Sequence, residues 1–314
     1  MAVGHASDNI GATGVTVIRG IDKAFRAGCA LLGRATGTRE LDALSTRHLV
    51  DRVDAIVLTG GSAFGLDAAG GVMRWMEERG RGFPVGVATV PIVPTAVVFD
   101  LGPLGSPTAR PTAAMAYDAC DRAQPNDIPE GSVGAGTGTT VGKGAGIDRA
   151  MKGGVGLAHR KADDLEVAAL IVVNALGDVR DGEGHIIAGA RAGDGSFVDL
   201  TRSLAAGSLP AESRYAAKAM QNTTLAVVMT NVALSREELA QLAAASSIAL
   251  GRRITPVGTS YDGDVVFATS PMEGPRATPL QIEVLAVAAL EEAIERAVRA
   301  ARGRDGIPGL ADSS

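Results

Sequence analysis

Two short segments carry side chains that could take part in catalysis. Asn222-Thr223-Thr224 opens the apolar, β-branched run 224–230, and Asp262-Gly263-Asp264 stands directly before another such run, 265–268. A threonine hydroxyl becomes a nucleophile when a base takes its proton, and paired carboxylates can transfer protons. Both segments also have an ordinary explanation, because Asn and Thr are common at strand starts and two aspartates can be solvated in a turn. The residues alone leave both interpretations open.

A glycine-rich stretch, 131–146, invites comparison with a phosphate-binding loop. That pattern needs glycine at position 137 and a hydroxyl residue at position 144, where the sequence has Thr137 and Gly144. A tight loop that approaches a site, or that crosses between two sheets, explains the glycines without a nucleotide.

The turn 60–65, Gly-Gly-Ser-Ala-Phe-Gly, follows a predicted buried strand over 53–59 and precedes a predicted helix over about 65–79. Phe64 stands where a nucleophile elbow needs glycine, and Ser62 stands where a dinucleotide fingerprint needs its second glycine. The turn therefore predicts neither a serine nucleophile nor a nucleotide-dependent oxidoreductase. Its free amides could bind a carboxylate or water.

No metal or cofactor is predicted from the histidines and cysteines. The four histidines share no metal-binding spacing, and the two cysteines are far apart: His5, His48, His159, His185, Cys29 and Cys120. Without a disulfide framework, a reducing cytoplasm is the expected compartment.

Charge and hydropathy argue against two partners, nucleic acids and membranes. The formal net charge is -5 and the basic residues are scattered, so we expect no nucleic-acid partner. No apolar run reaches about 18 residues, and the amino terminus lacks a signal-peptide pattern, so we expect neither membrane insertion nor secretion.

The element pattern indicates one α/β domain over 1–314 with a continuous core. Beyond the units above, it predicts strands near 154–159, 166–174, 184–189 and 224–230, and helices from Ser235 to about Leu250 and from Thr278 to about Arg302. The residues 303–314 lack periodicity and predict a frayed tail.

Taken together, the segments resemble the L-aminopeptidase/D-esterase family of self-processing peptidases, which also contains the nylon-oligomer endohydrolases. The resemblance spans nearly the whole chain. It is carried by 54–67, by Pro91-Ile92-Val93-Pro94 with Phe99-Asp100, by the loop 131–146, by 222–224 with Thr230-Asn231, and by 262–264.

The resemblance implies a four-layer αββα sandwich of the N-terminal-nucleophile type. It also implies self-cleavage after Asn222 into fragments 1–222 and 223–314, which remain in one fold and assemble into a homo-oligomer. The implied nucleophile is Thr223, where many relatives have Ser, and this leans toward the nylon-oligomer branch.

The family pattern further implies an oxyanion-binding amide at Asn174, a site lysine at Lys143, and supporting carboxylates at Asp262 and Asp264. Where some relatives have tyrosine before Asp100, this chain has Phe99, so a hydroxyl contact is missing there. The implied substrates are short peptides or ω-amino-acid oligomers. The alternatives are an uncleaved noncatalytic relative and an acyltransferase of the ornithine acetyltransferase type.

The implied chemistry suits a threonine that becomes an amino terminus. Its own α-amine, with a reference pKa of about 7.7–8.0, can then accept the hydroxyl proton. Before cleavage the nitrogen of Thr223 is an amide, so another group or a water must assist the first attack. Self-cleavage would therefore create the base that turnover uses.

Overall fold

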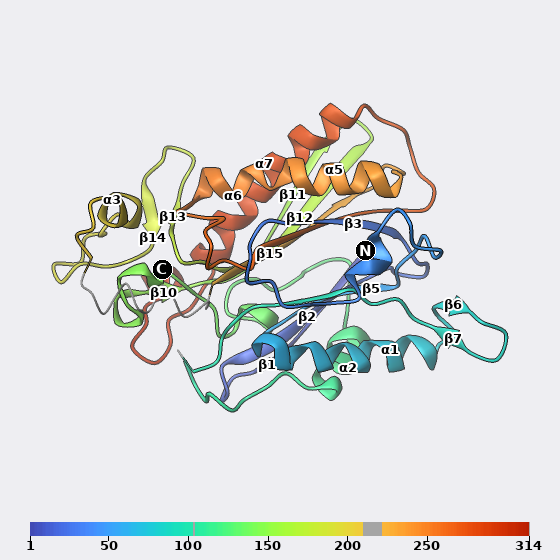
Figure 1. Cartoon of the computed structure of the whole chain (residues 1–314), viewed down its shortest axis with the longest axis horizontal. Helices are drawn as coiled ribbons and strands as arrows, with labels where there is room; N and C mark the ends of the chain where they lie inside the picture. Colours follow the sequence, from blue (N-terminus) through green and yellow to red (C-terminus); the bar gives the residue numbers. More distant parts are fainter. Residues whose placement is uncertain (103, 210–221, 314) are drawn as a thin grey trace.

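The computed structural model describes residues 1–102, 104–209 and 222–313 and places two sheets face to face, with helices on both outer sides (Figure 1). In this part of the chain the first sheet has the order β1-β2-β5-β8-β4 and the second β11-β12-β15-β17-β3. The first sheet comprises β1 (Ala2–Asp8), β2 (Thr13–Arg19), β5 (Ala55–Thr59), β8 (Thr95–Val97) and β4 (Thr38–Arg39). The second comprises β11 (Gly154–Ala162), β12 (Leu165–Asn174), β15 (Thr223–Thr230), β17 (Val265–Ser270) and β3 (Arg26–Leu31). This is the αββα sandwich that the resemblance implied.

Helices cover the outer face of each sheet. α1 (Ala69–Glu77) and α2 (Ala113–Asp121) pack on the first sheet, and α5 (Arg236–Ser246) and α7 (Pro279–Arg299) pack on the second (Figure 1). α6 (Ile248–Arg253) lies against α7. The smaller elements are α3 (Leu200–Ala205), the pair β9 (Thr140–Val141) and β10 (Met151–Lys152), the pair β6 (Phe83–Pro84) and β7 (Thr89–Val90), and a sheet of β14 (Ile186–Ala188), β13 (Asp178–Arg180) and β16 (Ile254–Thr255).

The strand β15 is buried on both faces. Leu225 and Val227 lie in the core between the two sheets, with Leu58 of β5, whereas Ala226 and Val228 lie in the core beneath α5 and α7. Because alternate side chains of a strand point to opposite faces, a strand covered on both sides is apolar at almost every position. This is why 224–230 gives so strong a strand signal.

Several predicted boundaries differ from the structure. The helix predicted over 65–79 begins instead with a 3-10 segment, Ser62–Ala68, before α1. The predicted strand 184–189 is the short β14, which belongs to the separate three-stranded sheet. Ser235 and Glu238 do form the expected capping box of α5.

The segment predicted as a frayed tail is instead packed over its described residues. Ile307 is buried in a small cluster with Ala12 and Leu104, and the N–H of Gly303 donates to the carboxylate of Asp312. Isolated contacts of this kind leave no periodic pattern in a sequence, so the packing of this segment was not predicted.

The glycine-rich stretch 131–146 threads between the two sheets. On one side the N–H of Ala135 donates to Thr16 Oγ of β2, and on the other Gly131 and Val155 of β11 exchange both backbone hydrogen bonds. A Cβ at Gly138 would lie 2.0 Å from the carbonyl oxygen of Ala12. The glycines therefore allow backbone to pass close to backbone, which is the crossing interpretation.

A buried lysine ties this stretch together. Lys152 is 1% exposed, and its Nζ donates to the carbonyl oxygens of Gly136, Thr137 and Thr139 at 3.2, 3.0 and 2.7 Å. An ammonium has three N–H groups, so all three can be used on these carbonyls.

We expect Lys152→Met to lower the free energy of unfolding by about 3 kcal/mol, because a side chain of similar length fills the space but donates to none of the three carbonyls. Urea unfolding measures the change. Lys161→Met on β11 is the matched control, because its side chain is 58% exposed and its pairing with Glu166 is at the surface. Equal stability of the two variants would contradict this structural role.

Candidate functional site

One end of β12 and the starts of β15 and β17 lie side by side at one end of the second sheet. β12 ends at Asn174, which lies opposite Thr223, the first residue of β15. On the other side of β15, Leu225 pairs with Val265 of β17, and the parallel ladder continues in the same register to an isolated bridge between Asn222 and Asp262. The segments singled out by their chemistry are therefore neighbours in space.

The carbonyl group of Asn222 accepts two hydrogen bonds. The hydroxyl of Thr223 donates to it at 2.6 Å, and the backbone N–H of Gly263 donates to it at 2.9 Å. Thr223 is 4% exposed. By the alternation of β15 its side chain faces the space between the sheets, as Leu225 does.

The two aspartates are not the solvated turn residues of the simpler interpretation, since both side chains are buried. Asp264 Oδ1 accepts a hydrogen bond from the N–H of Thr224 at 2.7 Å, and Asp262 Oδ2 accepts one from the N–H of Thr259 at 2.7 Å. Asp264 is thus held directly beside the peptide that joins Thr223 and Thr224.

The ammonium of Lys143 lies beside the same strands, at the end of the glycine-rich stretch. Its Nζ donates to the backbone oxygen and to Oδ1 of Asn174, at 3.1 and 2.8 Å. Burial lowers the pKa of Lys143 to about 7, and the negative charges of Asp262 and Asp264 act in the opposite direction. Burial, followed by repulsion from Asp262, raises the pKa of Asp264 to about 7. Such a cluster can gain or lose a proton near neutral pH.

Several contacts orient the side-chain amide of Asn174. Besides Lys143, the N–H of Thr140 donates to its Oδ1 at 3.1 Å, and its Nδ2 donates to the carbonyl oxygen of Phe99 at 3.0 Å. Phe99 therefore contacts the site through its backbone, which does not depend on its side chain. Donors at Oδ1 and an acceptor at Nδ2 therefore fix which way the amide of Asn174 points.

Sequence reasoning missed the backbone groups of the site. The N–H of Gly263, the N–H of Thr140 and the carbonyl of Phe99 are present whatever the residue type, so no sequence signal indicates them. It also missed the burial of the Asn222 side chain, which is 1% exposed and whose Oδ1 and Nδ2 have no hydrogen-bond partner among the described residues.

Within the described ranges, no side chain of the turn 60–65, of the histidines or of the cysteines forms a hydrogen bond or ion pair with this cluster. The turn at Gly60 does bind a carboxylate, as its free amides suggested, but it is the protein's own: the N–H of Gly61 donates to Asp100 Oδ1 at 2.6 Å. Among the described residues, no three His, Cys, Asp or Glu side chains are grouped as metal ligands. No helix in the described ranges is long and apolar enough to cross a membrane.

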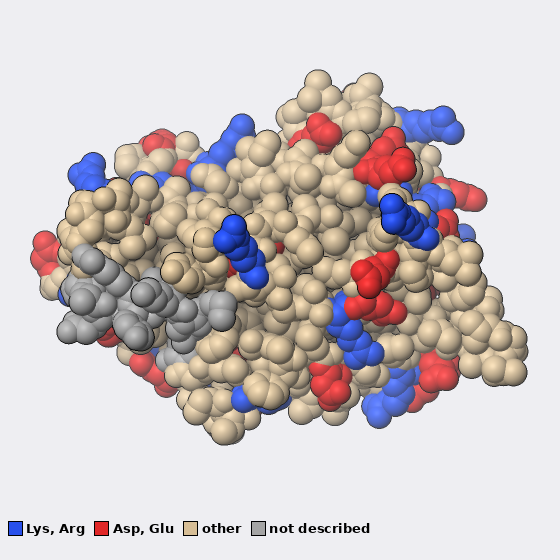
Figure 2. Space-filling model, viewed as in Figure 1, with Lys and Arg blue, Asp and Glu red and all other residues tan. Residues whose placement is uncertain are grey.

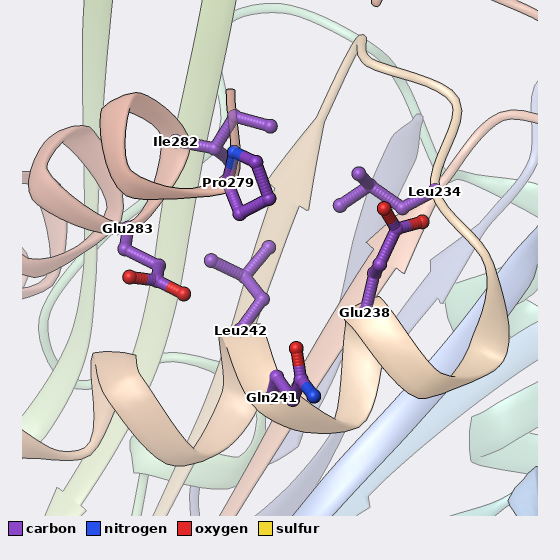
Figure 3. A pocket seen from close by; sticks show the side chains of 7 residues that line it. All are labelled: Leu234, Glu238, Gln241, Leu242, Pro279, Ile282 and Glu283. Atoms are coloured by element: carbon purple, nitrogen blue, oxygen red, sulfur yellow. The ribbon is translucent and has the colours of Figure 1, made fainter. Parts of the chain in front are cut away.

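A cavity between α5 and α7 lies at the opposite end of β15. It is lined by Leu234, Glu238, Gln241, Leu242, Pro279, Ile282 and Glu283 (Figure 3). Leu234 follows the end of β15, and a strand of eight residues spans about 25 Å, so this cavity is remote from Thr223.

The charged side chains form no broad basic area on the face shown in Figure 2, where Lys and Arg alternate with Asp and Glu. Elsewhere in the described chain, charged side chains pair across short distances, as Arg253 does with Glu291 and Glu295. This agrees with the scattered charge pattern of the sequence.

The fold is that of the N-terminal-nucleophile hydrolases. The L-aminopeptidase D-Ala-esterase/amidase of Ochrobactrum anthropi, described as a new variant among the Ntn hydrolase fold, superposes with a TM-score of 0.71. The superposition covers 98% of this chain and 86% of that one, at 20% sequence identity.

The chain belongs to peptidase family S58, whose pattern it matches over residues 1–310. An uncharacterized aminopeptidase of Mycobacterium tuberculosis is 40% identical over 280 residues, which are 86% of this chain and 76% of that protein. The 6-aminohexanoate-oligomer endohydrolase of a Kocuria species is 32% identical over 275 residues, 86% of this chain and 72% of that protein. The chain is accordingly a hydrolase.

We expect Asp262→Asn to lower the pKa of Asp264, because it removes the negative charge that adds to the effect of burial. Carboxyl-carbon NMR titration of the Thr223→Ala chain, in which no cleavage is expected, measures it. Asp194→Asn, in an exposed turn, should leave that pKa unchanged. An unchanged or higher pKa in Asp262→Asn would contradict the coupling.

Proposed function

We propose that the chain cleaves itself between Asn222 and Thr223, and that the freed Thr223 then hydrolyses amide bonds as an amino-terminal nucleophile. The observation that carries this proposal is the pair of hydrogen bonds to the Asn222 carbonyl, from the Thr223 hydroxyl and the Gly263 N–H. A nucleophile and an oxyanion donor thus stand at one peptide bond of the chain itself. Membership of a peptidase family supports hydrolysis as the reaction class.

In the first step, Thr223 Oγ bonds to the carbonyl carbon of Asn222, and its proton passes to the Asp264 carboxylate, directly or through a water. The carbon–nitrogen bond to Thr223 then breaks, and the proton is returned to the leaving nitrogen. This gives an ester between the Asn222 carboxyl and the Thr223 hydroxyl. Water hydrolyses the ester and leaves fragments 1–222 and 223–314. A pKa of Asp264 of about 7 suits a group that both accepts and donates a proton.

Burial of the Asn222 side chain favours cleavage. A buried polar group without a partner costs about 1–3 kcal/mol, and neither polar atom of this amide has a partner within the part of the chain that the structure describes. Cleavage would let Asn222 move away and regain hydrogen bonds to water. Part of the driving force would therefore be present in the folded precursor.

In turnover, the α-amine of Thr223 accepts the proton from its own hydroxyl as Oγ attacks the substrate carbonyl. The resulting ammonium passes that proton to the substrate nitrogen as its bond to the carbonyl carbon breaks, and the amine leaves. Water then hydrolyses the acyl-enzyme and frees Thr223 Oγ. Asp264 and Asp262 stabilise the protonated amine, and Asn174 donates to the oxyanion while Lys143 holds its carbonyl end. The contact from Lys143 Nζ to Asn174 Oδ1 supports this positioning.

The substrate class we propose is a short peptide or an ω-amino-acid oligomer. Curated relatives include aminopeptidases and 6-aminohexanoate-oligomer endohydrolases, and both activities cleave amides. A panel of amino-acid p-nitroanilides, β-peptides and aminohexanoate oligomers distinguishes these substrates.

We also propose that cleaved chains assemble into a homo-oligomer in the cytoplasm. Exposed apolar residues on the β6–β7 hairpin, Val85 and Val87, support burial against another copy. The two free cysteines support a reducing compartment.

We expect Thr223→Ala to run as one band on a denaturing gel and to lack amidase activity, because the attacking oxygen is gone. Thr223→Ser, which keeps an attacking hydroxyl, should still yield two fragments, with masses that place the cut after residue 222. Two fragments from Thr223→Ala would rule out the mechanism.

We expect Asn174→Ala to reduce kcat of the cleaved enzyme by about 10²–10³-fold, as loss of one oxyanion donor does. Asn231→Ala is the control, because Asn231 bonds to Glu166 and Asp164 near the opposite end of β12. If Asn174→Ala hydrolysed amides at the normal rate, Asn174 would have no such role.

A further inference from the structure

We propose that Gly263 provides the oxyanion donor for self-cleavage and that the position must be glycine to leave room for the nucleophile. This inference rests on the proposed cleavage after Asn222 and adds a residue to it. Gly263 lies between Asp262 and Asp264, whose side chains drew attention in the sequence, but its contribution is its backbone.

The donor is placed by the strand register. Because β15 and β17 are parallel, alternate residues of each strand direct their N–H and C=O groups to the other, and the bridge between Asn222 and Asp262 extends that pattern past the start of β15. The N–H of Gly263 consequently points at the carbonyl that would be attacked, at 2.9 Å. An oxyanion donor is expected at 2.7–3.1 Å.

The bond strengthens as charge develops. When Thr223 Oγ bonds to the carbonyl carbon, the π electron pair moves onto the oxygen of Asn222, and the hydroxyl proton leaves to Asp264. The hydroxyl then no longer donates to that oxygen. Of the two hydrogen bonds to this carbonyl, the one from the Gly263 N–H remains to stabilise the negative charge. A donor fixed in a sheet needs no reorganisation at that moment.

The position of Gly263 also leaves no room for a side chain. A Cβ at position 263 would lie 2.8 Å from Thr223 Oγ and 2.6 Å from the carbonyl oxygen of Ala35. Ala35 also donates its N–H to the Asp262 carbonyl at 3.0 Å, so the backbone on that side is held in place. Any larger residue would push against the attacking oxygen.

The test replaces the amide by an ester, which keeps the shape but removes the N–H. Full-length chain with Gly263→glycolic acid is made by translation with an acylated suppressor tRNA, and the rate of cleavage is measured on the protease-resistant, folded fraction. We expect a rate about 10²–10³-fold below that of the normal chain.

Two controls make the result specific. Ala35→lactic acid removes the N–H that donates to Asp262 from the other side, so it weakens the same backbone without touching the Asn222 carbonyl, and its cleavage rate should stay within a few fold of normal. Gly193→glycolic acid, in an exposed turn, should have no effect.

The inference is overturned if Gly263→glycolic acid cleaves at the normal rate, or if Ala35→lactic acid slows cleavage as strongly. Thr223→Ala is run in parallel to separate this from the proposed function. If Thr223→Ala still gives two fragments, the cleavage mechanism itself is wrong. If it stays whole while the Gly263 ester cleaves normally, only the role of Gly263 falls.

Discussion

The pairing of β15 on both of its edges is the constraint on which the site depends. Antiparallel pairing with β12 sets Asn174 opposite Thr223, and parallel pairing with β17 sets Asp262 beside Asn222. A slip of one residue on either side would turn the Thr223 side chain toward the helices and move the Gly263 amide away from the carbonyl. The buried apolar faces of β15 make such a slip costly, so the core specifies the geometry of the site.

Burial of charge is the second property that organises this region. One ammonium and two carboxylates lie together with almost no exposure to solvent. Both aspartates raise the pKa of Lys143, and Asp262 raises that of Asp264. Burial favours the neutral form of each group, whereas Lys143 favours the charged forms of the two aspartates. The balance leaves groups with opposite charges titrating in the same range near neutrality. Burying charged groups costs free energy in a purely structural core, but here the same burial brings their pKa values close to neutral and so lets them transfer protons.

The family resemblance predicted the αββα layers and named the side chains that the structure brings together at the end of the second sheet. The apolar run of β15 and the capping box at Ser235 follow rules that depend on residue type, and the family resemblance placed Lys143 and Asn174. The Phe99 carbonyl was missed because backbone hydrogen bonds are available to every residue and leave no trace in composition. The packing of 303–313 was missed because it rests on a few isolated contacts without periodicity. Gly263 carried a weak signal, since a glycine between two aspartates also describes an ordinary turn.

The order of strands in the second sheet has a consequence for the proposed two-fragment enzyme. β12 and β3 belong to the part before residue 222, and they enclose β15 and β17 from the part after it. The smaller fragment would therefore supply the two inner strands of a sheet whose outer strands come from the larger one. Cleavage would turn the β12–β15 and β17–β3 pairings of this sheet into interfaces between separate chains. Once separated, the fragments would have to find each other by diffusion, so recovery would depend on concentration and the persistence of the cleaved enzyme would be governed by its unfolding rate.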